Sequence, residues 1–297
     1  MSGEIGTTIV IALNGREKNL IRLVAALEPA ARDGIELIFA CAGDCPKAVT
    51  ERLPKSTFIR ANADALIPNL WRDGIRAARS RRVALLTSEC IPAEGWLEHV
   101  LTTDIERWAG VGGVLVNDPD SDALNWAVYL LRYIRFAPPM NGGRVDDIAA
   151  DNAVYDRDAI LAYPDLLDDG FWEPSFHVRF HEAGRELMLD PGMFVTHSGT
   201  NEAGPFLRHR FAHGREYGES RGMRSGIGKR LALLAASPAL PVLILGRIVA
   251  RSSSRGLVGP MIRSLPWLML FVLAWAGGES RGYLGALLGS SKRIQDR

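Results

Sequence analysis

A group of polar side chains follows an apolar run near residue 90. Residues 83–86 read VALL, the pattern of a buried strand, and Thr87-Ser88-Glu89 come directly after it. One carboxylate and two hydroxyls at a strand end offer oxygen atoms to a cation or to a polar ligand. The same residues are also typical of a simple turn in which Ser or Thr caps the next helix. The local pattern leaves both interpretations open.

The elements around this group alternate strand and helix at short spacing. We expect strands at residues 7–13, 35–40, 57–60 and 83–86, and helices at residues 19–31 and 67–79. This alternation predicts a mostly parallel, doubly wound sheet. Ligands of such sheets bind beyond the carboxyl ends of the strands, where we expect Asn14, Gly43 and residues 87–89. The polar group is therefore in the right place for a site.

The next hundred residues give less regular signals. We expect a helix from Trp96 to Trp108, a strand at 110–116, an irregular segment at 117–150, helical residues from about 157 to Tyr163, a helix closed by Gly184, and a last strand at 194–197. A long irregular segment in a compact domain is usually either functional or disordered.

Charge is distributed unevenly along the 297 residues. Residues 1–203 hold 20 Lys and Arg against 30 Asp and Glu, whereas residues 204–297 hold 15 against 4. An acidic front joined to a basic, apolar tail argues against nucleic acid as a partner. It favours a folded domain held at an anionic membrane surface.

The cysteines and the amino terminus bear on the compartment. Cys41, Cys45 and Cys90 are an odd number, and no second Cys/His pair stands at zinc-finger spacing. We expect them to be reduced thiols in a cytoplasmic compartment. The first residues lack the basic, apolar and small-residue order of a signal peptide.

The tail holds two strongly apolar segments. Residues 231–250 are about long enough to span a bilayer, but two prolines and Arg247 weaken that interpretation. Residues 265–276 are short for a span and better suited to an in-plane, re-entrant or tilted segment. Basic residues on every flank favour interfacial attachment on the cytoplasmic side. The alternative is a buried pair of apolar helices in a soluble protein.

Several segments together resemble the family 2 glycosyltransferases, whose nucleotide-sugar-binding domain has the GT-A fold. TTIVIALNGREKNL is similar to the family's first strand and turn, and DGIRAARSRRVALLTSECIPAEGWLEHVL resembles its DxD block. GFWEPSFHVRFHEAGREL resembles the block with the catalytic base. RHRFAHGREYGESRG and the tail with Gly278-Glu279 and Gly282-Tyr283 resemble membrane-associated members. The resemblance covers nearly the whole chain and implies a GT-A-type domain over residues 1–225 and a membrane-associating helical tail over 226–297.

Two acidic positions of the family are changed. The second strand normally ends in an Asp that binds the nucleotide base, but this chain has Cys41 there, with Asp44 three residues later. The DxD normally binds the metal that holds the diphosphate, and here it is Thr87-Ser88-Glu89. Either Glu89 still helps to hold a divalent cation, or the site works with little help from a metal, or the protein no longer transfers a sugar.

The resemblance also implies roles for individual residues. Glu173 is the expected catalytic base, desolvated by Phe171-Trp172; the structural alternative is a Glu that interacts with the dipole of the helix it begins. For Mg²⁺ or Mn²⁺ we expect Glu89 and His197, although a lone His is often structural. We expect Asp151, Asn152 and Trp172 on the acceptor side, with Asp151 as a further oxygen for the cation.

On the donor side we expect eight residues and one associated histidine. They are Asn14, Arg16, Cys41, Gly43, Asp44, Ser88, Arg210 and Arg215, with His213 near the last two. Arginine matches the geometry of phosphate, so Arg210 and Arg215 are candidates for contact with the diphosphate. Contact with anionic lipid is the alternative for the same side chains.

The predicted function is inverting transfer of a sugar from a nucleotide sugar to a lipid-linked or polysaccharide acceptor at the cytoplasmic face of the membrane. The missing aspartates at positions 41, 87 and 88 support a second hypothesis, a catalytically silent relative that scaffolds or regulates a membrane polysaccharide assembly. A nucleotidyl-type transferase is a third, but Asn14-Gly15-Arg16 is too short for the phosphate-binding loop that it would need.

Overall fold

The computed structural model describes residues 6–14, 19–199 and 201–295. The chain forms two compact units: unit 1 is Met1–Pro119 with Phe136–Thr200, and unit 2 is Asp120–Arg135 with Asn201–Arg297. The predicted division into domains at residue 225 stays a prediction. Helix Ala203–Met223 belongs to unit 2 because it packs on the apolar tail.

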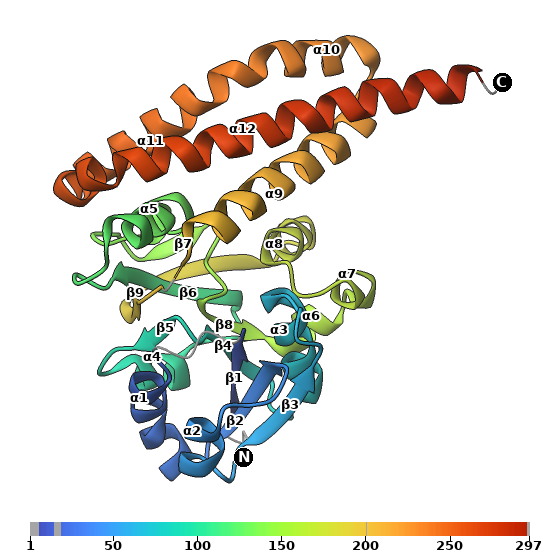
Figure 1. Ribbon diagram of the computed structural model, residues 1–297. Helices are drawn as coiled ribbons and strands as arrows, with labels where there is room; N and C mark the ends of the chain where they lie inside the picture. The colour runs from blue at the N-terminus through green and yellow to red at the C-terminus, as the bar shows by residue number, and fades with distance from the viewer. Residues whose placement is uncertain (1–5, 15–18, 200, 296–297) are drawn as a thin grey trace. The chain divides into compact units, whose positions relative to one another are not determined.

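The first half of unit 1 is the predicted doubly wound α/β sheet (Figure 1). Strands β1, β2, β3 and β4 run parallel in the order β3-β2-β1-β4. They and their connecting helices are β1 Thr7–Leu13, α1 Leu20–Arg32, β2 Glu36–Ala42, α2 Lys47–Arg52, β3 Thr57–Ala61, α3 Ile67–Ala77 and β4 Arg82–Thr87. The strand order reverses between β1 and β4, which makes their carboxyl ends the switch point of the sheet.

The second half of unit 1 extends this sheet beyond β4. Strand β8 runs antiparallel between β4 and β6, and β9 then runs parallel to β6. Two short strands, β5 and β7, pair antiparallel with β9. These elements are β5 Cys90–Pro92, α4 Trp96–Thr102, β6 Trp108–Asn117, β7 Gly143–Val145, β8 Asn152–Asp156, α6 Arg157–Leu161, α7 Pro164–Asp168, α8 Glu173–Glu182 and β9 Glu186–His197. The sheet is therefore mixed but mostly parallel among the described residues.

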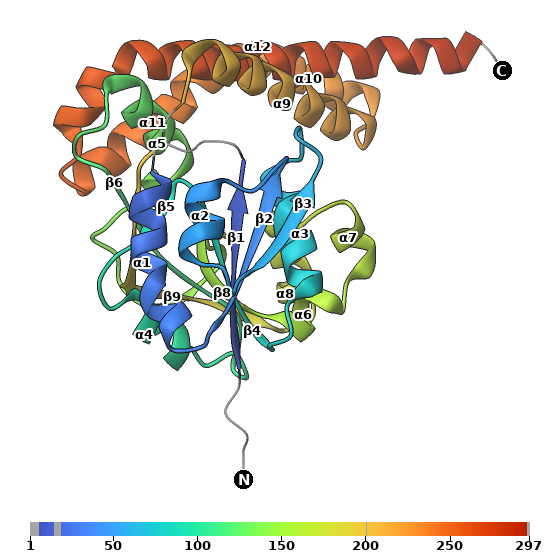
Figure 2. The ribbon, with the colours of Figure 1, turned by 60° about the horizontal axis from the view of Figure 1, so that its bottom comes forward.

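Helices cover both faces of the sheet, as a doubly wound topology requires. Figure 2 shows α1 and α3 on opposite sides of β1. On the α3 side, Val10 and Ile38 pack with Trp71 of α3 and with Phe176 and Phe180 of α8. This core holds α8 against the sheet and so fixes the position of Glu173, its first residue.

Two sequence expectations about helices were wrong. The helix that begins at Trp96 ends at Thr102 and not at Trp108, because Asp104 Oδ1 accepts hydrogen bonds from the backbone N–H groups of Glu106 and Arg107 and forms a turn. The segment 117–150 was expected to be irregular but contains helix α5, Ala123–Arg132, whose N-cap Asp122 accepts a hydrogen bond from the N–H of Asn125.

The expectation of three reduced thiols was also wrong. Cys41 and Cys45 form a disulfide, with 5.4 Å between their Cα atoms, and Cys90 is a buried free thiol. The turn between them contains Gly43 at φ +86°, a conformation that favours glycine and brings the two ends of the five-residue segment together.

Unit 2 is helical. Besides α5 and the 3₁₀ turn Ile134–Phe136, it contains α9 Ala203–Met223, α10 Ile227–Ala236, a 3₁₀ turn Ser237–Ala239, α11 Leu240–Ser254 and α12 Val258–Gln295. Residues 227–254 and 258–289 are long and apolar enough to cross a membrane by length and composition. The predicted apolar C-terminal helices are thus present, and the second is much longer than the expected 265–276.

Candidate functional site

The polar residues after β1 and β4 meet at the switch point. Ala12 on β1 is opposite Thr87 on β4, and the N–H of Ser88 donates to the carbonyl of Ala12 at 3.0 Å. Ser88 Oγ donates to Asn14 Oδ1 at 3.3 Å. Two of the predicted donor-side residues therefore touch each other where ligands of such sheets bind.

Strand β8 brings the carboxylate of Asp151 to the same strand end. Thr87 Oγ1 donates to Asp151 Oδ1 at 3.4 Å, and both side chains are buried. The antiparallel register of β4 and β8, with Leu86 opposite Asn152, places residue 151 beside residue 87. Asp151 thus joins the predicted site through a strand pairing that the sequence did not suggest.

Glu89 and His197 face each other across β5 and the end of β9. Their closest side-chain atoms, Oε2 and Nε2, are 3.7 Å apart, and both residues are buried. His197 Nδ1 lies 3.2 Å from Asn117 Oδ1, a contact that orients the ring with Nε2 toward Glu89. One carboxylate and one imidazole suit a cation held partly by the protein and partly by substrate phosphates. They do not suit a cage made by the protein, and the described residues contain no group of three or more metal-binding side chains.

Glu173 is the first residue of helix α8. Its charge acts on the hydroxyl of Tyr155, and so do the charges of Asp151 and Asp147. Burial above all, and these three carboxylates after it, raise the pKa of Tyr155 well above its ordinary value. Glu173 and Asp151 are therefore both close enough to Tyr155 for their charges to act on its hydroxyl.

Tyr155 belongs to a buried chain of polar groups that the sequence did not reveal. The hydroxyl of Tyr155 and Nε2 of His177 form a hydrogen bond of 2.9 Å. His177 Nδ1 then donates to Asp147 Oδ1 at 2.5 Å. The only sequence signal was the four-residue spacing of Glu173 and His177, which places both on one face of α8.

Asn152 and Trp172, both predicted on the acceptor side, differ from each other in burial. Asn152 is fully buried: its Nδ2 donates to the carbonyls of Val114 and Met193, and its Oδ1 accepts from Trp96 Nε1 at 2.8 Å. These hydrogen bonds connect strands and α4, and contact of Asn152 with an acceptor stays a prediction. Trp172 is 41 % exposed, and its Nε1 donates to the carbonyl of Asp169. It remains available to an acceptor.

The expected aromatic frame of Glu173 is only partly present. Phe171 is fully buried and packs against Trp71, Tyr155 and Phe176, inside the core. Trp172, the other member of the predicted pair, is 41 % exposed, and desolvation of Glu173 by the pair stays a prediction.

The carboxyl ends of β2 and β3 form the other side of the site. Asp44 is exposed and makes an ion pair of 2.7 Å with Arg60, while the sulfur of Cys41 is bonded to Cys45. Cys41 is thus no free thiol for a ligand. Beside them lies an open, polar pocket of about 530 Å³, whose lining includes Arg60, Asn62, Asn69 and Arg72. The sequence pattern did not point to these side chains, although Arg60 and Asn62 stand at the end of an expected strand.

The remaining donor-side predictions are Arg16, Arg210 and Arg215. Arg16 lies outside the described residues. Arg210 and Arg215 are on α9 in unit 2, where the guanidinium of Arg210 stacks 4.4 Å from the centre of the Trp275 ring. Burial and then the nearby Arg132 lower the pKa of Arg210 to about 10. Contact of Arg210 or Arg215 with a diphosphate stays a prediction.

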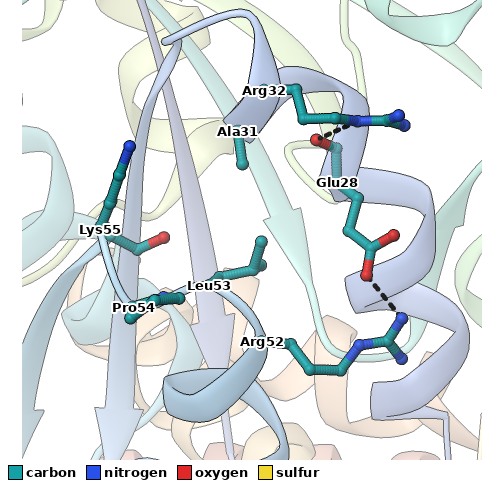
Figure 3. A pocket seen from close by; sticks show the side chains of 8 residues that line it. Glu28, Ala31, Arg32, Arg52, Leu53, Pro54 and Lys55 are labelled. Atoms are coloured by element: carbon teal, nitrogen blue, oxygen red, sulfur yellow. Dashed lines mark hydrogen bonds and ion pairs between the residues drawn. The ribbon is translucent and has the colours of Figure 1, made fainter.

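A second pocket lies at the other end of the strands, near their amino ends. Figure 3 shows it between the last turns of α1 and α2, where Glu28 pairs with Arg52 at 2.5 Å and Lys55 precedes β3. These residues stand at the amino ends of β2 and β3. The pocket therefore has no part in the switch-point site.

The fold has a known relative among solved structures. It is similar to that of the mannosyltransferase PcManGT from Pyrobaculum calidifontis, solved in complex with GDP-Man and Mn²⁺, with a TM-score of 0.53 and 13 % sequence identity. The similarity covers 94 % of this chain and 88 % of that one. No protein-family model and no curated protein matches the sequence. The predicted fold class, a GT-A-type α/β sheet followed by apolar helices, is therefore confirmed, and membership of family 2 stays a prediction.

Proposed function

We propose that the protein is a glycosyltransferase that moves a sugar from a nucleotide sugar to an acceptor hydroxyl with inversion. The observation that carries this proposal is the contact of Asp151 with Thr87 at the strand end that carries Glu89, in a fold similar to that of a sugar transferase, with Glu173 one helical turn before His177, which contacts Tyr155. Carboxylates of this number and placement serve the two tasks of such a reaction, proton transfer and neutralisation of the leaving group.

In the proposed reaction the acceptor oxygen attacks the anomeric carbon from the face opposite the diphosphate. The bond between that carbon and the diphosphate oxygen breaks, and the nucleoside diphosphate leaves with the electron pair. Glu173 takes the proton of the acceptor hydroxyl. The exposed Trp172, next to Glu173, offers an apolar surface on which an acceptor sugar can stack.

Charge on the leaving diphosphate has to be neutralised. Glu89 and His197 would hold a divalent cation there, with Asp151 as a further oxygen, and the cation would supply positive charge beside the phosphates. The turn after β1 and the polar pocket at the end of β3 would hold the nucleoside, through Asn14, Ser88 and Arg60.

We further propose that the acceptor is lipid-linked or a growing polysaccharide, and that transfer occurs at the cytoplasmic face of the membrane. The support is the composition of unit 2, which combines two long apolar segments with an excess of basic residues.

A single substitution tests the role of Glu173. We expect Glu173→Gln to lower the transfer rate by about 10²–10⁴-fold, since the amide cannot accept the proton of the acceptor. The matched control is Glu182→Gln at the other end of α8, where the exposed carboxylate makes only a 3.7 Å ion pair with Arg179. Transfer by Glu173→Gln at the wild-type rate would refute the role of this residue.

Donor binding is measured first, on the detergent-solubilised full chain. A panel of nucleoside diphosphates and nucleotide sugars, with Mg²⁺, Mn²⁺ or EDTA, should raise the melting temperature for one nucleotide, since ligands that bind the folded state stabilise it. A shift that requires the metal supports the cation site. Binding of a nucleotide sugar without turnover or hydrolysis would favour the silent scaffold, which Thr87-Ser88-Glu89 in place of the DxD also suggests.

A further inference from the structure

The outer side of α12 carries an apolar stripe with one interruption. Its exposed large apolar side chains are Val258, Ile262, Leu265, Met269, Leu270 and Leu273 and, after ten residues that include exposed Gly277 and Arg281, Leu284 and Leu288. Arg263 and Arg281 are both exposed. They are 18 residues apart, about five helical turns, so they lie at one azimuth of the helix. At a rise of about 1.5 Å per residue, the stripe is about 45 Å long, and the two arginines lie along one edge of it.

Helices α10 and α11 add a second apolar surface. They run antiparallel to α12, because Arg230 Nη1 donates to the carbonyl of Ala286 and Ser237 Oγ lies 2.7 Å from Ser280 Oγ. Ile227, Leu231, Val242, Leu243 and Val249 are each more than 40 % exposed. Only 11 % of the most apolar window of this segment is buried. By length alone, both α10–α11 and α12 are compatible with a transmembrane hairpin.

The other side of α12 is occupied by a charged helix in close contact. Glycines allow α9 to approach: a Cβ on Gly214 would lie 2.4 Å from the carbonyl oxygen of Trp275, and one on Gly218 would lie 2.3 Å from that of Glu279. A Cβ on Gly222 would lie 2.7 Å from that of Ala286. Together with the edge-on contact of the Phe206 and Phe271 rings, these contacts show that α9 runs parallel to residues 271–286 of α12.

Helix α9 is too polar for the interior of a bilayer. Its exposed residues include the charged side chains Arg208, Arg215, Glu216, Glu219, Arg221 and Arg224. A spanning α12 would carry these charges into the hydrocarbon, at a cost of about 2.5–3.5 kcal/mol for each at the centre. Residues 258–270 of α12 extend beyond α9 at one end, about 20 Å of helix against a hydrocarbon thickness of about 30 Å, and residues 287–295 extend beyond it at the other end. Figure 1 shows α5 beside this remaining part, near the α11–α12 turn, where Arg255 donates to the carbonyl of Arg135.

We infer that unit 2 lies in the plane of one leaflet of an anionic membrane and that neither apolar segment crosses it. The outer sides of α10, α11 and α12 enter the interface, and α5 and α9 face water. Exposed Arg247, Arg251, Arg263 and Arg281 meet lipid phosphates at the edge of the apolar surface. The inference rests on the membrane location proposed above and is independent of the transfer reaction.

Three positions on the stripe distinguish an in-plane helix from a spanning one. Ile262, Leu273 and Leu284 are 59 %, 51 % and 38 % exposed, and successive positions are 11 residues apart. Eleven residues are close to three turns, so the three side chains point to the same side, and the outer two are separated by about 33 Å along the axis. Each is replaced by Cys in the full chain, spin-labelled, and bound to vesicles of phosphatidylcholine and phosphatidylglycerol.

Immersion depth is measured from the accessibility of each label to oxygen and to a water-soluble nickel complex. We expect equal, shallow depths at the three positions, about 5–10 Å below the headgroups. Glu219→Cys on the exposed side of α9 is the matched control and should remain accessible to nickel. The parent protein, whose Cys90 is buried, serves as the labelling blank.

Two results would overturn the inference. Labels at 262 and 284 in opposite headgroup regions, with 273 deepest, would show that α12 spans the bilayer. Labels that all remain in water would show that the stripe does not enter lipid. Neither result bears on Glu173→Gln, which is assayed in detergent, so failure of the anchor and failure of the proposed transfer are distinguishable.

Discussion

At the scale of single residues, buried charge is concentrated around β8. Asp156, at the end of this strand, has a side chain that is 2 % exposed and lies between two arginines, Arg81 at 3.1 Å and Arg185 at 3.1 Å. Burial works to raise the pKa of Asp156, but the hydrogen bonds from Arg81 and Arg185 outweigh it and hold the pKa below its ordinary value of 3.8. At the other end of β8, the side chain of Asn152 accepts a hydrogen bond from Trp96 Nε1 and donates one to the carbonyl of Val114.

The lowered pKa of Asp156 predicts a pH dependence of stability. A carboxyl whose pKa is depressed by folding stabilises the folded state above its unfolded pKa, and this contribution is lost as the pH falls through the folded pKa. We expect Asp156→Asn to lower the free energy of unfolding by about 1–3 kcal/mol at pH 7. The difference from wild type should begin to shrink once the pH falls below the ordinary value of 3.8.

Urea denaturation at several pH values, followed by a spectroscopic signal from unit 1, measures this difference in the free energy of unfolding. The matched control is Asp158→Asn, because Asp158 is 68 % exposed and contacts the same Arg81 at 3.5 Å. An exposed ion pair contributes little, so this variant should stay within about 0.5 kcal/mol of wild type. A constant offset between Asp156→Asn and wild type down to acid pH would contradict the ion-pair account.

At the scale of elements, the packing of α9 on α12 depends on glycine at defined positions. Glycines on both helices leave room for the backbone of the other: a Cβ on Gly282 would lie 2.2 Å from the carbonyl oxygen of Arg215. Close by, Trp275 Nε1 and Tyr283 Oη both donate to the buried carboxylate of Glu279. The contact is therefore specified by size at the glycines and by hydrogen bonds at Glu279.

Two alanine substitutions on α12 should have opposite effects. Gly282→Ala must push the helices apart or distort them, and we expect a loss of about 1–3 kcal/mol. Gly285→Ala adds a methyl group where nothing lies within 4 Å, so we expect no loss and a gain of up to about 1 kcal/mol from helix propensity. Thermal unfolding of the full chain in mild detergent compares them. Equal melting temperatures for the two variants would count against this packing.

At the scale of the whole molecule, site and charge are divided between the two units. Unit 1 contains the switch-point carboxylates. It also contains most of residues 1–203, the part of the chain in which Asp and Glu outnumber Lys and Arg. Unit 2 combines an apolar surface with the basic residues 204–297, which hold 15 Lys and Arg against 4 Asp and Glu. Two forces should therefore hold the protein at a membrane, electrostatic attraction and burial of apolar surface.

Salt should separate these two forces. In sedimentation with vesicles that contain phosphatidylglycerol, we expect the bound fraction of the full chain to fall as salt rises from about 0.05 to 0.5 M, since the Debye length shortens. Binding should not vanish, because burial of the apolar stripe is insensitive to screening. Vesicles of phosphatidylcholine alone are the control and should bind more weakly, with little dependence on salt. Complete release by salt would mean that the stripe stays out of the lipid.

The sequence by itself determined the features that depend on neighbours along the chain. Apolar runs and helical periodicity predicted β1 to β4 and their helices, and with them the strand end at which Thr87-Ser88-Glu89 stand. The same local signals predicted the apolar tail. They failed at Thr103–Arg107, where a side chain of Asp104 competes for the backbone, and at α5, which lies among prolines, glycines and acids.

Only the tertiary structure decided which distant residues meet. The antiparallel insertion of β8 brings Asp151 to Thr87, and the packing of α8 brings Glu173 and His177 to Tyr155. The Cys41–Cys45 disulfide and the contact of α9 with α12 likewise depend on approach between backbones. Local periodicity reports which face of an element is buried but not which element covers it. Strand order, and contacts between residues tens of positions apart, follow from how the whole core packs.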